Sequence, residues 1–219
     1  MFLTPVPDAP FVGQVSTQRA ILRPNGTPIM LHRTGMIARD ADGRIRNQMT
    51  AFMPQNSTAT APVVVMHLYD PQNRLSTRLY PISRRFRILP IRHPPATDAP
   101  AGCASPAGSR LPPSPYTNEQ DLRTRTIAGQ EVHDVRETQK IPAAASGTGK
   151  EIVVTDEYWY SYDLNMNLSV TRTDPRTGSV TMTVTQLTRT DPDPSLFTIR
   201  AGYMPFGVPS PPAHKAASN

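Results

Sequence analysis

The chain has 219 residues, and its 23 Lys and Arg against 17 Asp and Glu give a formal charge of +6. It contains 14 Val, 11 Ile and 24 Thr but only five Glu and three Lys. Because β-branched residues favour strands and Glu and Lys favour exposed helix faces, this balance argues against a helical protein. A single cysteine, Cys103, excludes an intrachain disulfide and a Cys-cluster metal site. The longest apolar run, Val63 to Met66, is far shorter than the roughly 20 residues that cross a bilayer, so no transmembrane segment is expected.

In chain order, the first half reads as strands joined by short turns. The turn dipeptide Asn25-Gly26 and the loop Asp40 to Gly43 each separate two extended runs, which predicts two hairpins. In the run after Gly43, apolar residues alternate with polar ones, as expected for a strand with one buried face. The predicted strands are Phe11 to Leu22, Pro28 to Arg39, Arg44 to Met53, Val63 to Tyr69, Arg74 to Tyr80 and Arg84 to Ile91.

The second half shows the same alternation. Asp174 to Gly178 is predicted to reverse the chain between two amphipathic strands. A short helical turn is expected at Pro194, with Asp191 or Asp193 as its N-cap, and Leu196 and Phe197 are expected to be buried at the end of the sheet. The predicted strands are Leu122 to Ala128, Gln130 to Ile141, Glu151 to Ser161, Leu164 to Thr171 and Val180 to Thr185.

These elements predict a mainly all-β fold with at most one or two short helices. About ten antiparallel strands in a meander must twist, so the sheet is expected to curl into a half-barrel or open barrel with a concave apolar face. We expect a Pro-rich lead over residues 1–10, a single β domain over 11–204 and a disordered tail over 205–219. A Pro-, Ala- and Gly-rich loop at 94–115 interrupts the domain; the alternative, in which this segment separates two domains, is less favoured because neither half closes a sheet.

The basic residues are concentrated in the first half. Residues 1–93 carry 12 Arg against four Asp, whereas 115–219 carry 10 basic and 12 acidic residues. Nucleic acid is a disfavoured partner, because few aromatic residues accompany the arginines. A solvated face, or one that rests on anionic lipid or polysaccharide, is the favoured interpretation. The candidates for such anion or surface contact are Arg39, Arg44, Arg46, Arg85 and Arg87.

The aromatic run on the predicted strand Glu151 to Ser161 is the candidate ligand platform. The residues predicted to line it are Tyr158, Trp159, Tyr160 and Met166. Aromatic residues on a central strand also commonly form core, and that alternative stays open. The five histidines show no H-x-x-x-H spacing and the chain has no G-x-S-x-G motif, so we expect no metal, no cofactor and no catalytic residues.

Several strings carry a resemblance to a known kind of protein. They are Met36-Ile37-Ala38-Arg39-Asp40 followed by Asp42-Gly43-Arg44, then Glu157-Tyr158-Trp159-Tyr160-Ser161, Asp174-Pro175-Arg176 and Pro192-Asp193-Pro194-Ser195-Leu196-Phe197. Together they resemble a family of uncharacterised secreted bacterial β-proteins. The closing Leu-Phe to Tyr pattern is similar to that of periplasmic half-barrels of the lipoprotein-carrier and sigma-factor-regulator type. This resemblance implies a periplasmic or secreted location. The first residues are not expected to be a signal peptide, and a cytoplasmic location therefore stays open as an alternative.

The function predicted from the sequence is therefore binding rather than catalysis. We expect a non-enzymatic extracytoplasmic protein that holds an apolar ligand, a lipid or lipoprotein, or an envelope protein partner on a concave sheet. The alternative is a purely structural or adhesive envelope protein whose concave face is filled by its own side chains. A hydrolase is less favoured, since it would need carboxylates or histidines gathered in one cleft. An apolar cavity of a few hundred cubic ångströms on the concave face would favour binding, and a packed face would favour the structural alternative.

Overall fold

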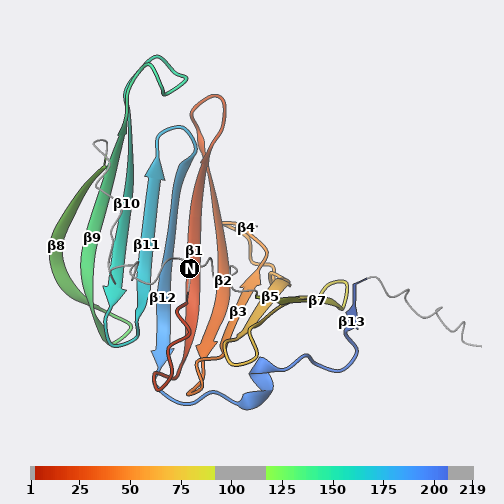
Figure 1. The fold of residues 1–219 in the computed structure, drawn as a ribbon. Helices are drawn as coiled ribbons and strands as arrows, with labels where there is room; N and C mark the ends of the chain where they lie inside the picture. The colour runs from red at the N-terminus through yellow and green to blue at the C-terminus, as the bar shows by residue number, and fades with distance from the viewer. Residues whose placement is uncertain (1–2, 92–116, 207–219) are drawn as a thin grey trace, which may run out of the picture.

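The computed structural model describes residues 3–91 and 117–206. In these residues one open, curved sheet runs through the whole molecule (Figure 1). The predicted loop at 94–115 and most of the predicted tail lie outside the described residues. The first half of the chain forms β1 (Phe11–Leu22), β2 (Pro28–Arg39), β3 (Ile45–Thr50), β4 (Met53–Pro54), β5 (Val63–Asp70), β6 (Leu75–Tyr80) and β7 (Arg85–Pro90).

The second half completes the sheet. It forms β8 (Thr117–Ile127), β9 (Gln130–Ile141), β10 (Ile152–Ser161), β11 (Met166–Asp174), β12 (Gly178–Thr188), the 3-10 helix η1 (Pro194–Phe197) and β13 (Met204–Pro205). Within the described residues η1 is the only helix, and the strands match the predicted ones closely. The expectation of an all-β antiparallel half-barrel is confirmed.

The two halves of the chain meet at the centre of the sheet. The strand order is β13-β7-β6-β5-β3-β2-β1-β12-β11-β10-β9-β8, with β4 added to β2. β1 therefore pairs with β12, although the two strands lie at opposite ends of the sequence. All pairs in the described residues are antiparallel except the short β13–β7 pair, which is parallel.

The central β1–β12 seam depends on a glycine. Gly178 begins β12 with a φ of +102°, a conformation that L side chains rarely adopt. A Cβ at this position would overlap the carbonyl oxygen of Ala20 in β1. The turn predicted at Asp174 to Gly178 is thus present, and its glycine also allows the close approach of the two halves.

Two hydrophobic clusters support the sheet. The main cluster joins both halves and contains Phe11, Val15, Ile37, Ile127, Val132, Trp159, Leu164, Met166, Leu168 and Val184. A smaller cluster of Met66, Leu68 and Leu79 lies on β5 and β6, with Phe86, Ile199 and Tyr203 packed against it. Ile199 and Tyr203 come from the segment after η1, so this segment covers the smaller cluster.

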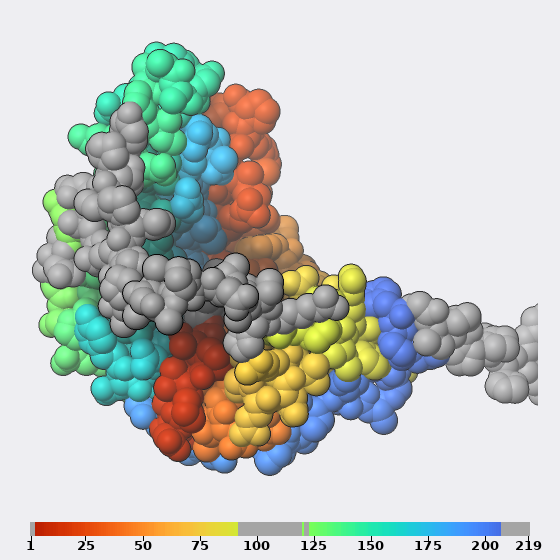
Figure 2. All heavy atoms as spheres, viewed as in Figure 1, coloured from red at the N-terminus to blue at the C-terminus, as the bar shows by residue number. Residues whose placement is uncertain are grey.

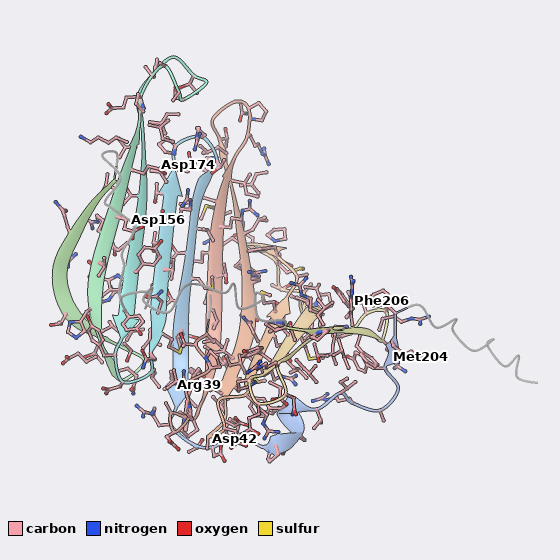
Figure 3. All side chains as sticks on the ribbon, in the orientation of Figure 1. Arg39, Asp42, Asp156, Asp174, Met204 and Phe206 are labelled. Carbon is pink, nitrogen blue, oxygen red and sulfur yellow. The ribbon has the colours of Figure 1, made fainter. Side chains whose placement is uncertain are left out.

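The segment before β1 is held to the sheet by Arg39. This side chain is fully buried. Its Nε donates to the carbonyl oxygen of Ala9 (2.9 Å), Nη1 to that of Thr4 (2.8 Å) and Nη2 to that of Leu164 (2.8 Å). Burial lowers the pKa of its guanidinium. Figure 3 shows Arg39 near the lower ends of the central strands.

The C-terminal segment is held in a similar way. Asp193 caps η1, because its Oδ1 accepts from the backbone N–H of Ser195 at 2.8 Å, as predicted. Arg46 donates from Nη1 to the carbonyl oxygen of Leu196 (2.7 Å), and the Arg44 guanidinium lies 5.2 Å from the ring centre of Phe197. Leu196 and Phe197 are only half-buried, so the expectation that they plug the end of the sheet is wrong. Ile199 and Tyr203, just beyond η1, cover the apolar cluster instead.

Candidate functional site

Two rows of side chains cross the central strands on the face that also carries Arg39. We call this the inner face. Directly paired residues of neighbouring antiparallel strands point to the same side, so each row forms a continuous surface. The first row is Tyr158, Val170, Met182, Thr17 and Arg33. The second row is Asp156, Arg172, Val180, Arg19 and Leu31.

The inner face contains a pocket of about 340 Å³ at the upper end of these rows. Its walls include Arg19, Arg33, Phe52, Arg172 and Val180, and the turn that begins at Asp174 closes one side. Figure 2 shows the surface over β11 and β12 set back between the β9–β10 loop and the β1–β2 loop. Figure 3 shows Asp156 and Asp174 near this end of the sheet.

The arginines of the pocket differ in their partners. Arg172 is paired with Asp156 (Nη1 to Oδ2, 2.7 Å), and Asp174 is paired with Arg176 at the turn (Oδ2 to Nη2, 2.8 Å). Arg33 lies over the ring of Phe52, with its guanidinium carbon 4.4 Å from the ring centre. Within the described part of the chain, no carboxylate forms an ion pair with Arg19 or Arg33. Burial, and then the positive charge of Arg19, lower the pKa of Arg33.

A second pocket, of about 450 Å³, lies where the N-terminal segment meets β3, β5 and β6. Leu3 and Pro5 form one wall, and Ile45 and Tyr69 are among the residues of the other. His67 also lines it, with its Nε2 2.7 Å from the hydroxyl of Ser76. Burial and the nearby Arg78 lower the pKa of His67, so the neutral imidazole is favoured.

The predicted ligand platform is not assembled as one surface. Tyr158 lies half-buried in the first row of the inner face, and the hydroxyl of Tyr160 donates to Oδ1 of Asn165 at 2.6 Å. Trp159 and Met166 are buried in the main cluster, at 3% and 1% exposure. They therefore contribute packing rather than ligand contact, because so little of either side chain is exposed. Trp159 also points to the face opposite Tyr158, its neighbour in the strand.

The five predicted anion-contact arginines are also dispersed. Arg39 and Arg46 are buried and donate to backbone carbonyl oxygens, which leaves them inaccessible to an external anion. Arg44 pairs with Asp40 at 2.5 Å, and Arg85 donates to the carbonyl oxygen of Pro205 at 3.2 Å. Arg87 is exposed on β7 and lines a separate hollow beside Phe206. For Arg85 and Arg87, contact with an anion or a surface stays a prediction.

The sequence analysis did not identify the three arginines that line the pocket, Arg19, Arg33 and Arg172. Arg19 and Arg33 lie on the two strands of the Asn25-Gly26 hairpin, and counting outward from that turn would have placed them on one face. The sequence held no comparable signal for Arg172, because its place in the row of Arg19, with Val180 between them, requires the β1–β12 pair.

The described residues were compared with the requirements of a metal site and of a membrane-spanning helix. No three His, Cys, Asp or Glu side chains there are grouped closely enough to hold a metal ion. The same residues contain no helix with the length and apolar character needed to cross a membrane.

No family model and no curated protein sequence matches this chain. Among solved structures, it is similar to the MucA/MucB complex of Pseudomonas aeruginosa, at 12% identity over 89% of this chain and 56% of that one, with a TM-score of 0.45. It is also similar to a LolA superfamily protein from Nitrosomonas europaea (12% identity, 88% and 91% covered, TM-score 0.34). A third is a putative outer membrane lipoprotein-sorting protein domain from Vibrio parahaemolyticus (12% identity, 86% and 89% covered, TM-score 0.29).

The chain thus spans little more than half of the first of these structures. The names of the other two agree with the class of half-barrel that the closing sequence pattern resembles. With TM-scores below 0.5, these similarities carry no argument about what this protein binds. The resemblance of the motif strings to a secreted family stays a prediction.

Proposed function

We propose that this is a non-catalytic, extracytoplasmic binding protein that holds an apolar ligand, a lipid or a segment of a partner protein on the inner face of its sheet. The observation that carries the proposal is the pocket of about 340 Å³ over the central strands. Its volume is in the range of small-molecule sites, and such sites combine apolar walls with a few polar groups.

The composition of the inner face supports binding over a purely structural role. Tyr158, Val170 and Met182 form an apolar strip beside the pocket, and all three are half-buried rather than fully packed. A structural or adhesive protein was expected to fill this face with its own side chains. Among the described residues, the lower part of the sheet is packed in this way and the upper part is not.

The experiment compares two neighbouring residues of β12 that point to opposite faces. Val180 lines the pocket, whereas Thr181 lies on the other face and bonds to the hydroxyl of Thr171 at 3.3 Å. The probe is N-phenyl-1-naphthylamine, a neutral apolar dye whose fluorescence increases on binding. We expect saturable binding to the wild type, a loss of about tenfold or more in affinity for Val180→Asp, and little change for Thr181→Asp, because a carboxylate in the pocket opposes entry of an apolar group.

Thermal unfolding of both variants checks that they remain folded. Absence of saturable binding to the folded wild type would contradict the proposal. Equal loss of binding in the two variants would place the dye elsewhere and would contradict it as well.

A further inference from the structure

The pocket on the inner face holds positive charge that the described residues do not neutralise. Arg172 and Asp156 form one ion pair, and Asp174 and Arg176 form another. These two pairs leave Arg19 and Arg33 as unpaired cations of the pocket within the described chain. Two like charges in a recess repel each other, and an anion between them removes that repulsion.

The register of the strands brings these two arginines together. Arg19 pairs with Leu31, and Thr17 pairs with Arg33, so the two arginines are diagonal neighbours across the β1–β2 hairpin. Diagonal neighbours lie about 7–8 Å apart at the backbone, a separation that two long side chains can bridge. Each guanidinium presents a planar fork of N–H donors, which matches the geometry of a phosphate or carboxylate.

Phe52 orients the guanidinium of Arg33. The Arg33 guanidinium lies over its ring at 4.4 Å, which orients the side chain but supplies no acceptor for its N–H groups. The edge of the guanidinium remains available for hydrogen bonds. Arg33 is half-buried, so an anion that it binds is partly shielded from water.

Apolar side chains adjoin the charged end of the pocket. Val180 separates Arg19 from Arg172 in the second row. In the first row Thr17 lies next to Arg33, and Met182 and Val170 follow beyond it. A ligand that uses both features has an anionic head and an apolar chain. Building on the proposed function, we infer that the inner face takes an anionic amphiphile of the lipid type, with its phosphate or carboxylate head between Arg19 and Arg33.

The test uses decyl phosphate, decanol and inorganic phosphate as probes, each titrated into the full chain by calorimetry below the micelle concentration. Charge-assisted hydrogen bonds of this kind correspond to roughly tenfold to hundredfold in affinity. We expect decyl phosphate to bind at least about tenfold more tightly than decanol, and inorganic phosphate to bind far more weakly than decyl phosphate. Added salt should weaken the binding of decyl phosphate and leave that of decanol unchanged.

Matched variants locate the effect. Arg19→Gln and Arg33→Gln should each weaken decyl phosphate binding about tenfold, with little change for decanol. Arg23→Gln is the control, because Arg23 is an exposed arginine in the loop between β1 and β2, and its loss lowers the net charge equally. The affinities of Arg19→Lys and Arg33→Lys for decyl phosphate should lie between those of the wild type and the glutamine variants. Lysine retains the positive charge but lacks the planar set of N–H donors.

Results that differ from these expectations would overturn either the anionic head group, the apolar chain or the proposed function as a whole. Equal binding of decanol and decyl phosphate, unaffected by the glutamine variants, would overturn the anionic head group and leave the proposed binding function standing. Inorganic phosphate binding as tightly as decyl phosphate would show a free-anion site and overturn the amphiphile. If neither decyl compound binds the folded protein, this inference and the proposed function both fail.

Discussion

Arginines perform different tasks in the two halves of the sheet. In the half formed by β1 to β7, the buried Arg39 and Arg46 donate to backbone carbonyl oxygens outside the strand ladders, whereas the half-buried Arg44 pairs with Asp40. In the half formed by β8 to β12, arginines pair with carboxylates within or between strands, as in Arg172–Asp156, Arg136–Glu157 and Arg176–Asp174.

The difference follows from what each half must hold in place. The strands of the second half satisfy each other's backbone groups, and their arginines are partly exposed. Solvent screening there leaves the ion pairs with little free energy. The segment before β1 and the segment around η1 have carbonyl groups that no ladder satisfies. A buried guanidinium with several donors supplies hydrogen bonds that these segments lack. Removal of Arg39 takes the donor from the carbonyls of Ala9 and Leu164, whereas the Thr4 carbonyl still accepts from the backbone N–H of Val6 at 2.9 Å.

The largest expected effect tests the first half. Arg39→Met should destabilise the protein by about 3–5 kcal/mol, because the buried carbonyls of Ala9 and Leu164 lose their donor and that of Thr4 loses one of two. Arg46 donates to one backbone carbonyl oxygen, that of Leu196. Arg46→Met should therefore destabilise the protein less, by about 1–2 kcal/mol. Urea denaturation measures both. A cost for Arg39→Met no larger than that for Arg46→Met would break the comparison.

The seam between the halves should tolerate no side chain at Gly178. Gly178→Ala combines a φ of +102° with overlap of its Cβ and the Ala20 carbonyl oxygen, so we expect a loss of about 3 kcal/mol. Gly129→Ala is the matched control: its φ is +78°, and no atom lies within 4 Å of the added Cβ. That variant should cost only about 1 kcal/mol in a thermal or urea unfolding assay. Equal losses of stability at the two positions would show that backbone strain, and not the close approach of β1 and β12, determines the cost of replacing Gly178.

Within the described part of the second half, one carboxylate, that of Asp134, does not pair with an arginine as the others described above do. Asp134 is 1% exposed, and neither of its carboxylate oxygens has a hydrogen-bond partner in the described residues. Burial, and then the charge of Glu157, raise its pKa. The folded state therefore holds this proton more tightly than the unfolded state, so its contribution to stability is present at low pH and is lost as the pH rises through the raised pKa.

Asp134→Asn should accordingly stabilise the protein at pH 7 by about 1–2 kcal/mol. The gain over the wild type should shrink as the pH falls below the ordinary Asp value of about 4, where both states of the wild type are protonated. Urea denaturation at several pH values follows this difference. Destabilisation by Asp134→Asn at pH 7 would mean that the charged carboxylate is stabilised by Arg125 and Arg136.

The smallest expected effect concerns the cross-strand pair of Asp156 and Arg172. Arg172 is 49% exposed, so the pair should contribute only about 0–0.5 kcal/mol, and added salt should remove even this. A double-mutant cycle with Asp156→Asn and Arg172→Gln measures the coupling energy. A coupling above about 2 kcal/mol would show that the two halves do not differ in how their arginines act.

The sequence by itself determined the local structure. Extended runs bounded by turn residues placed β1, β2 and β9 at the residues where the structure has them, because turn residues such as Asn25-Gly26 and Gly129 mark a strand end locally. The N-cap at Asp193 and the turn at Gly178 were also predictable, since each depends on side chains and backbone angles within a few residues.

Tertiary structure alone decided which strands meet and which side chains they bring together. The β1–β12 pair places Arg172 in the row of Arg19, although the two lie more than 150 residues apart in sequence. The irregularities between Trp159 and Tyr160 and between Gln14 and Val15 change the register locally, which no repeating pattern announces. Burial of Arg39, Trp159 and Met166 likewise depends on contacts with distant segments, and local periodicity carries no information about those contacts.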